Sequence, residues 1–578
     1  MRPVTLVVIG LMAGLCLLSS NRTAIAGESG LRPFPLPLAA SSALPFDVDV
    51  ERVRQLDAAG KISEAQREFD ILAWQVFLAL NWPADADGHP DPKKTLADRT
   101  SDRVWGFWRS SHTIFLDDGE TPLPWGAPGT DGRMGDLFRS KAAWRQHLTS
   151  ADENFEAFSG PLVDQNGKWA RYEVLVNHEE FDYLFENRLY NLDGQVAFSQ
   201  QGAGNRVEFP ANDVAQKKHG AIEIKLAWKE LGPNDDHSRF FVRRVQATLS
   251  EPSSTGQPQT RDYDAGLVGM HIAMRTRSSP EWVWATFEQI DNVRVNNTAD
   301  GRPIHPNFFN PDSKQPVNVL PAKNAVIDPA TGMPIPAPAG TTPTTWIESL
   351  TTDPVQVQRI DVPAQNGLND SDAVLAAGTA ALNHEVQAAL QGGSSVFQYY
   401  ELIGTQWPIH PSAPAFAGGN ASAPDSIRQK TPGMMVPVFL INTTMETYFQ
   451  KGSQPAGPLE QDDRLADGSP PIDKTPVVGT ESCVGCHYSA GMAIGFKRNA
   501  DGSYQIDPVT HKRIPIFGEN GNFGLTGNAA FSWLLQIEGQ SAPVDTTAGA
   551  VPAAGGKRFT RSPAQFLDIL RVKPGQVQ

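Results

Sequence analysis

The sequence predicts an α+β fold, in which a large β-rich body carries helices at its edges and a mainly helical C-terminal region follows. Two observations support this fold class. Residues 27–296 contain several runs rich in Val, Ile and aromatic side chains, which are typical of strands. The chain also has 578 residues, of which 40% are hydrophobic and 13 are Trp, so it can bury several cores in two or three domains.

The β-rich body begins with a helical pattern. The stretch "EAQREFDILAWQVFLALN", residues 64–81, predicts a long and mostly buried helix that ends at Trp82-Pro83. The stretch "GPLVDQNGKWARYEVLVN", residues 160–177, predicts a hairpin that turns at Asn166-Gly167. Further strands are expected at residues 220–228, 239–249, 266–276 and 281–290.

A change of composition separates this body from the C-terminal part. Residues 297–345 are rich in Pro, Asn, Ala and Thr, which cannot supply a regular ladder or helix. We therefore expect a Pro-rich irregular connection over residues 297–370 and a C-terminal region over residues 371–578. In that region the patterns predict helices at 371–391, 529–537 and 562–570, a strand at 398–408, and a strand running into a helix at 434–450.

The first 26 residues read as a secretory signal peptide. Arg2 precedes an apolar run, and the run is followed by a small-residue cleavage site that ends at Ala26. A membrane anchor would need about 18 or more unbroken apolar residues, and this run is shorter. A lipid anchor at Cys16 would need a small residue beside the cysteine, where Leu15 stands. We expect residues 1–26 to be removed and the mature protein to be periplasmic or secreted.

The charge of the chain bears on its partners. Removing residues 1–26 takes away Arg2 and Arg22 but no acidic residue, so the formal net charge changes from −15 to about −17. This excess of negative charge argues against DNA, RNA or anionic lipid as a partner. Since no later segment is long and apolar enough to cross a bilayer, we also expect no membrane span in the mature chain.

One short motif carries most of the chemical information. The stretch "TESCVGCHYSAG", residues 480–491, holds Cys483, Cys486 and His487, and the chain has no other cysteine after residue 26. A C-x-x-C-H string is the signature of c-type haem attachment. On a helix the two thiols share a face and can form thioethers to the haem vinyl groups, while His487 can place a ring nitrogen on the iron. The motif therefore predicts one covalently bound haem c.

Two other uses of such cysteines fit the sequence less well. A redox-active Cys-x-x-Cys pair usually opens a helix after a buried strand, whereas this motif follows a loop rich in Pro and Gly. A structural zinc site needs further Cys or His ligands in a compact array, and the mature chain has no third cysteine.

The motif resembles the haem-attachment segment of the c-type cytochromes, and the resemblance covers little more than the motif. It implies that Cys483 and Cys486 form the thioethers and that His487 is the proximal axial ligand. In the common small cytochrome domain a methionine some tens of residues downstream supplies the sixth ligand. The only later methionine here is Met492, which stays on the proximal side because it follows His487 by five residues.

A sixth ligand, where the iron has one, is therefore expected upstream of the motif. His271, on a predicted strand, is the first candidate, and the alternative is a hydrogen-bonded core histidine. Met445, on the predicted helix that leads to the motif, is the second, and the alternative is core packing. His410 and His511 are expected to be solvated, and an open sixth position is a further alternative.

Two classes of function follow from a single haem. In the first, the protein is an electron-transfer cytochrome that exchanges one electron at a time with a redox partner protein. In the second, it is a haem enzyme or small-ligand sensor, peroxidase-like or gas-binding, whose iron has an open distal position. The large body favours a role beyond shuttling, but the absence of further haem motifs favours electron transfer. A binding protein with a structural haem is a third interpretation.

Overall fold

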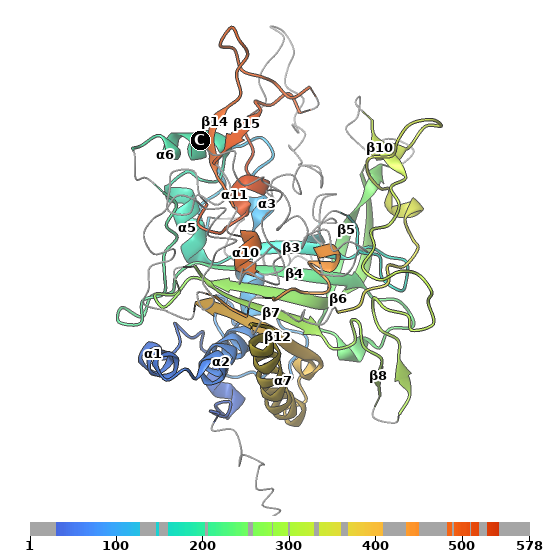
Figure 1. Cartoon of the computed structure of the whole chain (residues 1–578). Helices are drawn as coiled ribbons and strands as arrows, with labels where there is room; N and C mark the ends of the chain where they lie inside the picture. Colours follow the sequence, from blue (N-terminus) through green and yellow to red (C-terminus); the bar gives the residue numbers. More distant parts are fainter. Residues whose placement is uncertain are drawn as a thin grey trace, which may run out of the picture.

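The structure is a computed structural model of the whole chain (Figure 1). The residues that it describes are 31–127, 146–148, 160–202, 206–252, 258–279, 281–298, 301–328, 334–359, 368–408, 435–437, 439–449, 483–487, 490–508, 510–518 and 529–542. The predicted signal peptide, the predicted helix at 562–570 and His410 lie outside these residues.

A nine-stranded sheet is the centre of the fold. Its main path runs β1-β3-β4-β6-β7-β12-β13, with β5 beside β6 and β2 beside β5. All pairings are antiparallel except that of β2 with β5. The bounds are β1 Arg109–Ser110, β2 Gln146–Leu148, β3 Arg171–Val176, β4 Ile222–Glu230, β5 Val242–Pro252, β6 Pro258–Met274, β7 Val283–Gln289, β12 Tyr400–Pro408 and β13 Met435–Val436.

The strand predictions are confirmed in this sheet. The runs at 220–228, 239–249, 266–276, 281–290 and 398–408 correspond to β4, β5, β6, β7 and β12. The hairpin before them is confirmed too, because Val163 pairs with Trp169 across the turn. Gly167 takes a φ of +71° in that turn, a conformation that glycine adopts without steric cost.

Helices α2 Ile62–Leu80 and α7 Leu368–Gly392, the longest of the described chain, cover one apolar face of the sheet together with α1 Val50–Ala58. The three helices lie together on one side in Figure 1. The helices predicted at 64–81 and 371–391 are thereby confirmed as α2 and α7. Phe77 of α2 stacks on Phe287 of β7 with ring centroids 4.2 Å apart, and both side chains are fully buried.

Shorter elements cover the opposite face (Figure 1). The helices are α3 Ser111–Ile114, α5 His178–Glu186, α6 Leu192–Ser199, α10 Cys483–His487 and α11 Leu534–Ile537. A small sheet pairs β14 Ala493–Phe496 with β15 Pro515–Phe517. The 3-10 turns of the described chain are η1 Leu38–Ser41, η2 Val104–Phe107, η4 His237–Arg239, η5 Glu348–Leu350, η6 Val396–Tyr399 and η7 Thr447–Phe449. A second core, which includes Val484, Trp284 and Phe531, lies under these elements.

The predicted fold class, α+β with edge helices and a mainly helical C-terminal region, is wrong in two respects. The long helices α2 and α7 pack across a face of the sheet and not along its edges. In the C-terminal part that the structure describes, β12 and β13 belong to the main sheet, and the helices after α7 are only four and five residues long. The helix predicted at 529–537 shrinks to α11 because Ala530 and Phe531 have φ of +48° and +75°, which an α-helix excludes.

The Pro-rich connection is more regular than predicted. It contributes two short antiparallel ladders, β8 Asn296–Asn297 with β9 Pro303–Ile304 and β10 Ala325–Ile327 with β11 Pro334–Pro336. Each is a two-stranded sheet, in which both strands are edges and a proline without an N–H can be tolerated. Trp346 of this connection is buried in a core that also holds Trp169.

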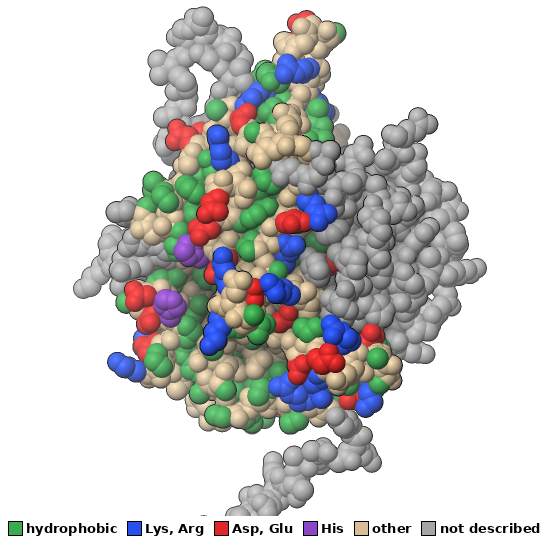
Figure 2. All heavy atoms as spheres, turned by 90° about the vertical axis from the view of Figure 1, so that its left-hand side faces the viewer, with side chains coloured by type: hydrophobic (Ala, Val, Ile, Leu, Met, Phe, Trp, Pro, Cys, Tyr) green, Lys and Arg blue, Asp and Glu red, His purple; other side chains and the backbone are tan. Residues whose placement is uncertain are grey.

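The outer surface mixes charges of both signs. Figure 2 shows Lys and Arg side chains interspersed with Asp and Glu over the face that it presents. Within the described ranges, none of the helices is long and apolar enough to cross a membrane.

Candidate functional site

The sheet face opposite the long helices carries ionisable side chains. Lys225 of β4, His271 of β6 and Thr286 of β7 are direct cross-strand partners, so they share this face. The neighbouring row of the same face begins with Glu223 on β4 and ends with Trp284 on β7. In β4 the residue between Glu223 and Lys225 has its side chain buried on the opposite, apolar face, because successive side chains of a strand point to opposite faces.

His487 of the C-x-x-C-H motif lies over this polar face. Its ring packs on Trp284, with centroids 4.4 Å apart and an interplanar angle of 48°. Nδ1 lies 2.8 Å from the carbonyl oxygen of Phe531, so this nitrogen carries the proton and donates it. In the part of the chain that the structure describes, Nε2 has no hydrogen-bond partner.

The surroundings of His487 favour a neutral imidazole. Burial is the main cause that lowers the pKa of His487 to about 4, and the nearby His271 and Lys225 contribute in the same direction. The hydrogen bond to Phe531 and the negative charge of Glu446 act in the opposite direction and are outweighed. At neutral pH the ring is therefore uncharged with Nε2 as the free electron-pair donor, which is the state that binds a metal.

The Phe531 carbonyl, which orients His487, belongs to a backbone segment with uncommon φ angles. Ala530 and Phe531 both have positive φ, and so does Trp282, the residue before β7, at +66°. The indole N–H of Trp282 donates to the carbonyl oxygen of Ala530 at 3.1 Å, which ties the two segments together. Non-glycine residues in this region cost on the order of 1–3 kcal/mol each and persist where surrounding contacts enforce them.

Side chains of the sheet fix α10 in place. Gln406 of β12 accepts a hydrogen bond from the Val484 amide at 2.8 Å and donates one to the Pro437 carbonyl at 2.7 Å. Cys483 is half-buried, and its thiol lies 3.9 Å from the carbonyl oxygen of Leu440. Cys486 lies on the same helix, and its side chain is outside the described part of the structure.

The first distal candidate, His271, lies on β6 as predicted and is half-buried. Its Nε2 is 3.5 Å from the Glu446 carboxylate. Burial raises the pKa of Glu446, but the neighbouring His271 and Lys225 outweigh burial, so the pKa of this carboxyl lies below its ordinary value. The structure thus brings His271 close enough to act electrostatically on His487, while its Nε2 faces a carboxylate.

The second distal candidate, Met445, has a different environment. Within 434–450 the predicted strand corresponds to β13, whereas the helix predicted after it is wrong, because β13 is followed by an irregular segment and by η7. Met445 is fully buried beside Tyr448 in the core cluster that includes Trp169. This cluster is distinct from the one that contains Val484 and Phe531. The structure does not bring Met445 together with His487.

Two further residues weighed from the sequence, His511 and Met492, lie in the described part of the chain. His511 is exposed on the turn between β14 and β15. Met492 is fully buried in the same core cluster as Val484, on the side of the motif.

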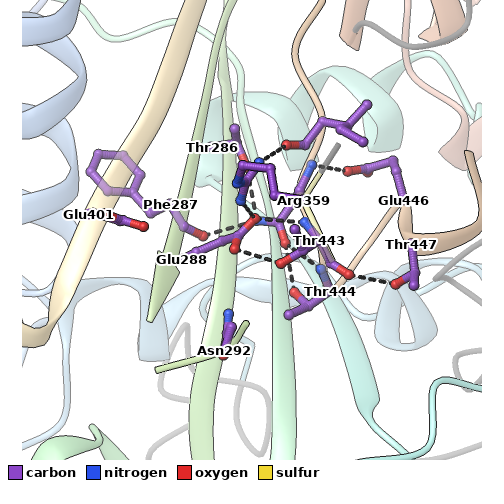
Figure 3. A network of polar contacts seen from close by, with 12 residues as sticks. Thr286, Phe287, Glu288, Asn292, Arg359, Glu401, Thr443, Thr444, Glu446 and Thr447 are labelled. Carbon is purple, nitrogen blue, oxygen red and sulfur yellow. Dashed lines mark hydrogen bonds and ion pairs between the residues drawn. The ribbon is translucent and has the colours of Figure 1, made fainter. Parts of the chain in front are cut away.

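A buried polar network holds the irregular segment 439–449 on the sheet (Figure 3). Glu288 of β7 accepts hydrogen bonds from both the amide and the hydroxyl of Thr443 at 2.6 Å and forms an ion pair with Arg359. The Asn442 side chain donates to Thr286 and to the Phe287 carbonyl. These contacts position the carbonyl of Leu440 near Cys483, and Glu446 near His271.

Close approach of this segment depends on one glycine of β6. A Cβ at Gly269 would lie 2.4 Å from the Thr444 hydroxyl oxygen and 3.2 Å from the methyl carbon of Met445. A side chain there would therefore push the segment away from the sheet.

Several polar residues of this site were not predicted from the sequence: Glu223, Lys225, Gln406 and Glu446. A signal for two of them was present, because "IEIKL" at 222–226 alternates apolar and charged residues, which predicts that Glu223 and Lys225 share one face of a strand. Nothing in the sequence pattern indicates that segments more than 200 residues apart would cover that face.

No protein-family model, curated protein or solved structure matches the chain. The structure is therefore the main evidence for the function. Within the described ranges, no group of three or more His, Cys, Asp and Glu side chains is arranged to hold a metal ion. A c-type haem requires less from the protein, because the porphyrin supplies four of the iron ligands and the protein one or two.

Proposed function

We propose that this protein is an exported c-type cytochrome that carries one haem c and transfers single electrons. Cys483 and Cys486 hold the haem through thioethers, and His487 is the proximal iron ligand. The observation that carries the proposal is the state of His487 within a C-x-x-C-H motif: a neutral imidazole with Nδ1 engaged by a carbonyl and Nε2 without a partner.

The residues around His487 suit a haem ligand. When bound, haem iron alternates between two oxidation states and so accepts or gives one electron. The Phe531 carbonyl fixes the tautomer and the orientation of His487, as second-shell partners of metal-binding histidines do. Trp284 packs against the ring and excludes water from that side. Gln406 anchors the backbone of α10 next to Cys483.

Export and partners belong to the same proposal. The signal peptide of residues 1–26 directs the protein to the periplasm or the exterior, where it is cleaved. There the protein would exchange single electrons with a redox partner protein.

A second candidate function, a haem enzyme or small-ligand sensor, is favoured by the polar sheet face. Lys225, His271 and Glu446 act electrostatically on His487, and such groups can orient a bound polar molecule or move protons to it. The first distal candidate, His271, has its Nε2 3.5 Å from the Glu446 carboxylate and is therefore already engaged by another side chain.

The first prediction tests covalent attachment. Wild-type protein, denatured and run on a gel, should retain haem staining, and Cys483→Ala with Cys486→Ala should abolish it because no thioether can form. Cys16→Ala is the matched control and should keep the stain, since this cysteine lies in the predicted signal peptide. Retained stain in the double variant would refute the proposal.

Absorption spectra of the purified haem protein separate the two candidate functions. A low-spin spectrum that carbon monoxide leaves unchanged supports electron transfer through a six-coordinate iron. A high-spin spectrum with rapid binding of carbon monoxide supports the enzyme or sensor. Loss of the low-spin spectrum in His271→Ala, but not in Met445→Ala, would assign the sixth ligand to His271.

A further inference from the structure

Glu180, in the first turn of α5, lacks the hydrogen-bond donor that an acidic residue at this position of a helix usually has. Asn177 caps the helix and accepts a hydrogen bond from the Glu180 amide at 3.2 Å. In a capping box, the acidic residue at this position accepts a hydrogen bond from the N-cap amide in return. Here the Asn177 amide donates to the Ile222 carbonyl of β4 at 3.1 Å instead. The carboxyl group of Glu180 is therefore left without its local donor.

Glu180 is fully buried, and neither of its carboxyl oxygens has a hydrogen-bond partner in the part of the chain that the structure describes. Burial raises the pKa of Glu180 well above its ordinary value, and the neighbouring Glu223 raises it further. Because ionising both carboxyl groups is unfavourable, the pair as a whole retains one proton. Glu223 is only half-buried, so the pair can exchange this proton with solvent.

The pair is connected to His487 in two ways. Glu223 forms a hydrogen bond with the Ser532 hydroxyl at 3.0 Å, and Ser532 follows Phe531, whose carbonyl accepts the proton of His487 Nδ1. Glu223 also lies in the same cross-strand row as Trp284, which packs on His487.

Other charged groups near the pair have different partners. Arg109 of β1 lies over the Phe181 ring at 5.0 Å and donates to the Leu123 carbonyl. Lys225 of β4 and His271 of β6 act on Glu446 and His487. The acidic neighbours on α5 are Glu179 and Asp182, which face His178. Within the described chain, Glu223 is the charge that acts on Glu180.

We propose that Glu180 and Glu223 hold one exchangeable proton and that Ser532 transmits their protonation to the hydrogen bond between Phe531 and His487. This inference rests on the proposed function. It means that electron transfer is coupled to the binding of a proton. When a one-electron donor delivers an electron to the site, the pair binds one proton from solvent, and oxidation releases it. Linkage is reciprocal, so a protonated pair must also favour the reduced state.

Redox titration at a series of pH values tests the proposal. In wild-type protein the midpoint potential should fall as the pH rises through the range where the pair titrates. In Glu180→Gln, which resembles the protonated form, it should change much less over the same range. Glu186→Gln is the matched control, because Glu186 is exposed on the same helix, and it should behave as wild type. An unchanged pH dependence in Glu180→Gln would overturn the proposal.

A second variant separates a positioning role from a structural one. Ser532→Ala leaves both carboxyl groups in place but removes their connection to Phe531, so it should weaken the pH dependence of the potential while the fold is retained. Far-UV circular dichroism checks the fold. A Ser532→Ala protein whose potential follows pH as wild type does would exclude transmission through this hydroxyl.

The proton-binding pair can also be tested without haem. Because the pKa of Glu180 is raised on folding, its contribution to stability is complete below its unfolded pKa and is lost as the pH rises through the folded pKa. In the haem-free Cys483→Ala, Cys486→Ala protein, Glu180→Gln should remove this decline. Failure to find haem would refute the proposed function, whereas an unaltered decline in Glu180→Gln would refute the pair itself.

Discussion

At the scale of single residues, the neutral state of His487 makes folding depend on pH. Its pKa in the folded chain, about 4, lies below the ordinary value near 6.5, so the unfolded chain binds a proton first as the pH falls. The contribution to stability is present above about pH 6.5 and is lost on the way down to about pH 4. At about 1.4 kcal/mol per pKa unit, this contribution is on the order of 3 kcal/mol.

Urea unfolding of the haem-free Cys483→Ala, Cys486→Ala protein checks this expectation. The free energy of unfolding should fall between about pH 6.5 and pH 4.5, and His487→Gln should reduce that fall. His511→Gln is the matched control, because His511 is exposed, and it should leave the fall unaltered. An equal fall in the His487→Gln protein would show that other groups cause it.

At the scale of elements, the segment 439–449 has no helix or strand before η7 and depends on the network around Glu288 (Figure 3). Glu288 is 1% exposed and satisfies both donors of Thr443. Glu288→Ala should cost at least about 2 kcal/mol of stability, because it leaves buried donors and the charge of Arg359 without a partner. It should also lower the haem content, since this segment lies against Cys483 and His271.

The control for this prediction lies on the neighbouring strand. Glu401 is the direct cross-strand partner of Glu288 and pairs with Arg294, whose side chain is 55% exposed. Glu401→Ala should cost no more than about 1 kcal/mol, because solvent screens the remaining arginine. Chemical denaturation and the ratio of haem to protein would measure both variants. Equal effects would contradict the role assigned to the network.

The elements show which features of this fold can be predicted from sequence. The strands and long helices were predictable because their patterns of apolar residues are local. The segments 434–450 and 529–537 were not, because tertiary contacts of Asn442, and the positive φ of Ala530 and Phe531, override local helical preference. The same holds for the candidate site. The C-x-x-C-H motif could be predicted because its spacing is local, whereas the contact between Ser532 and Glu223 could not, because it joins residues 309 positions apart.

At the scale of the whole molecule, two cores share one sheet. The core with Phe77 lies on one face, and the core with Trp284 lies on the other. Phe77→Ala should cost about 3–5 kcal/mol, because it opens a cavity beside Phe287. Both faces should then unfold at the same lower denaturant concentration, since the sheet connects them.

Hydrogen exchange read by mass spectrometry checks this coupling. Peptides that contain α2 and peptides that contain His487 should lose protection together in Phe77→Ala. Val374→Ala on α7 is the control, because Val374 is 55% exposed, and it should change stability by less than about 0.5 kcal/mol. Loss of protection confined to α2 would show that the two faces open independently.

Every strand of the main sheet precedes Cys483 in the chain. A chain that emerges with its N-terminus first therefore delivers the whole sheet, together with α2 and α7, before the motif appears. During that interval the apolar face is already closed, while the face with Lys225 and His271 still awaits α10 and the residues after it. The fold thus sets an order of assembly in which α10 and the residues after it arrive last and close over a surface that has already formed.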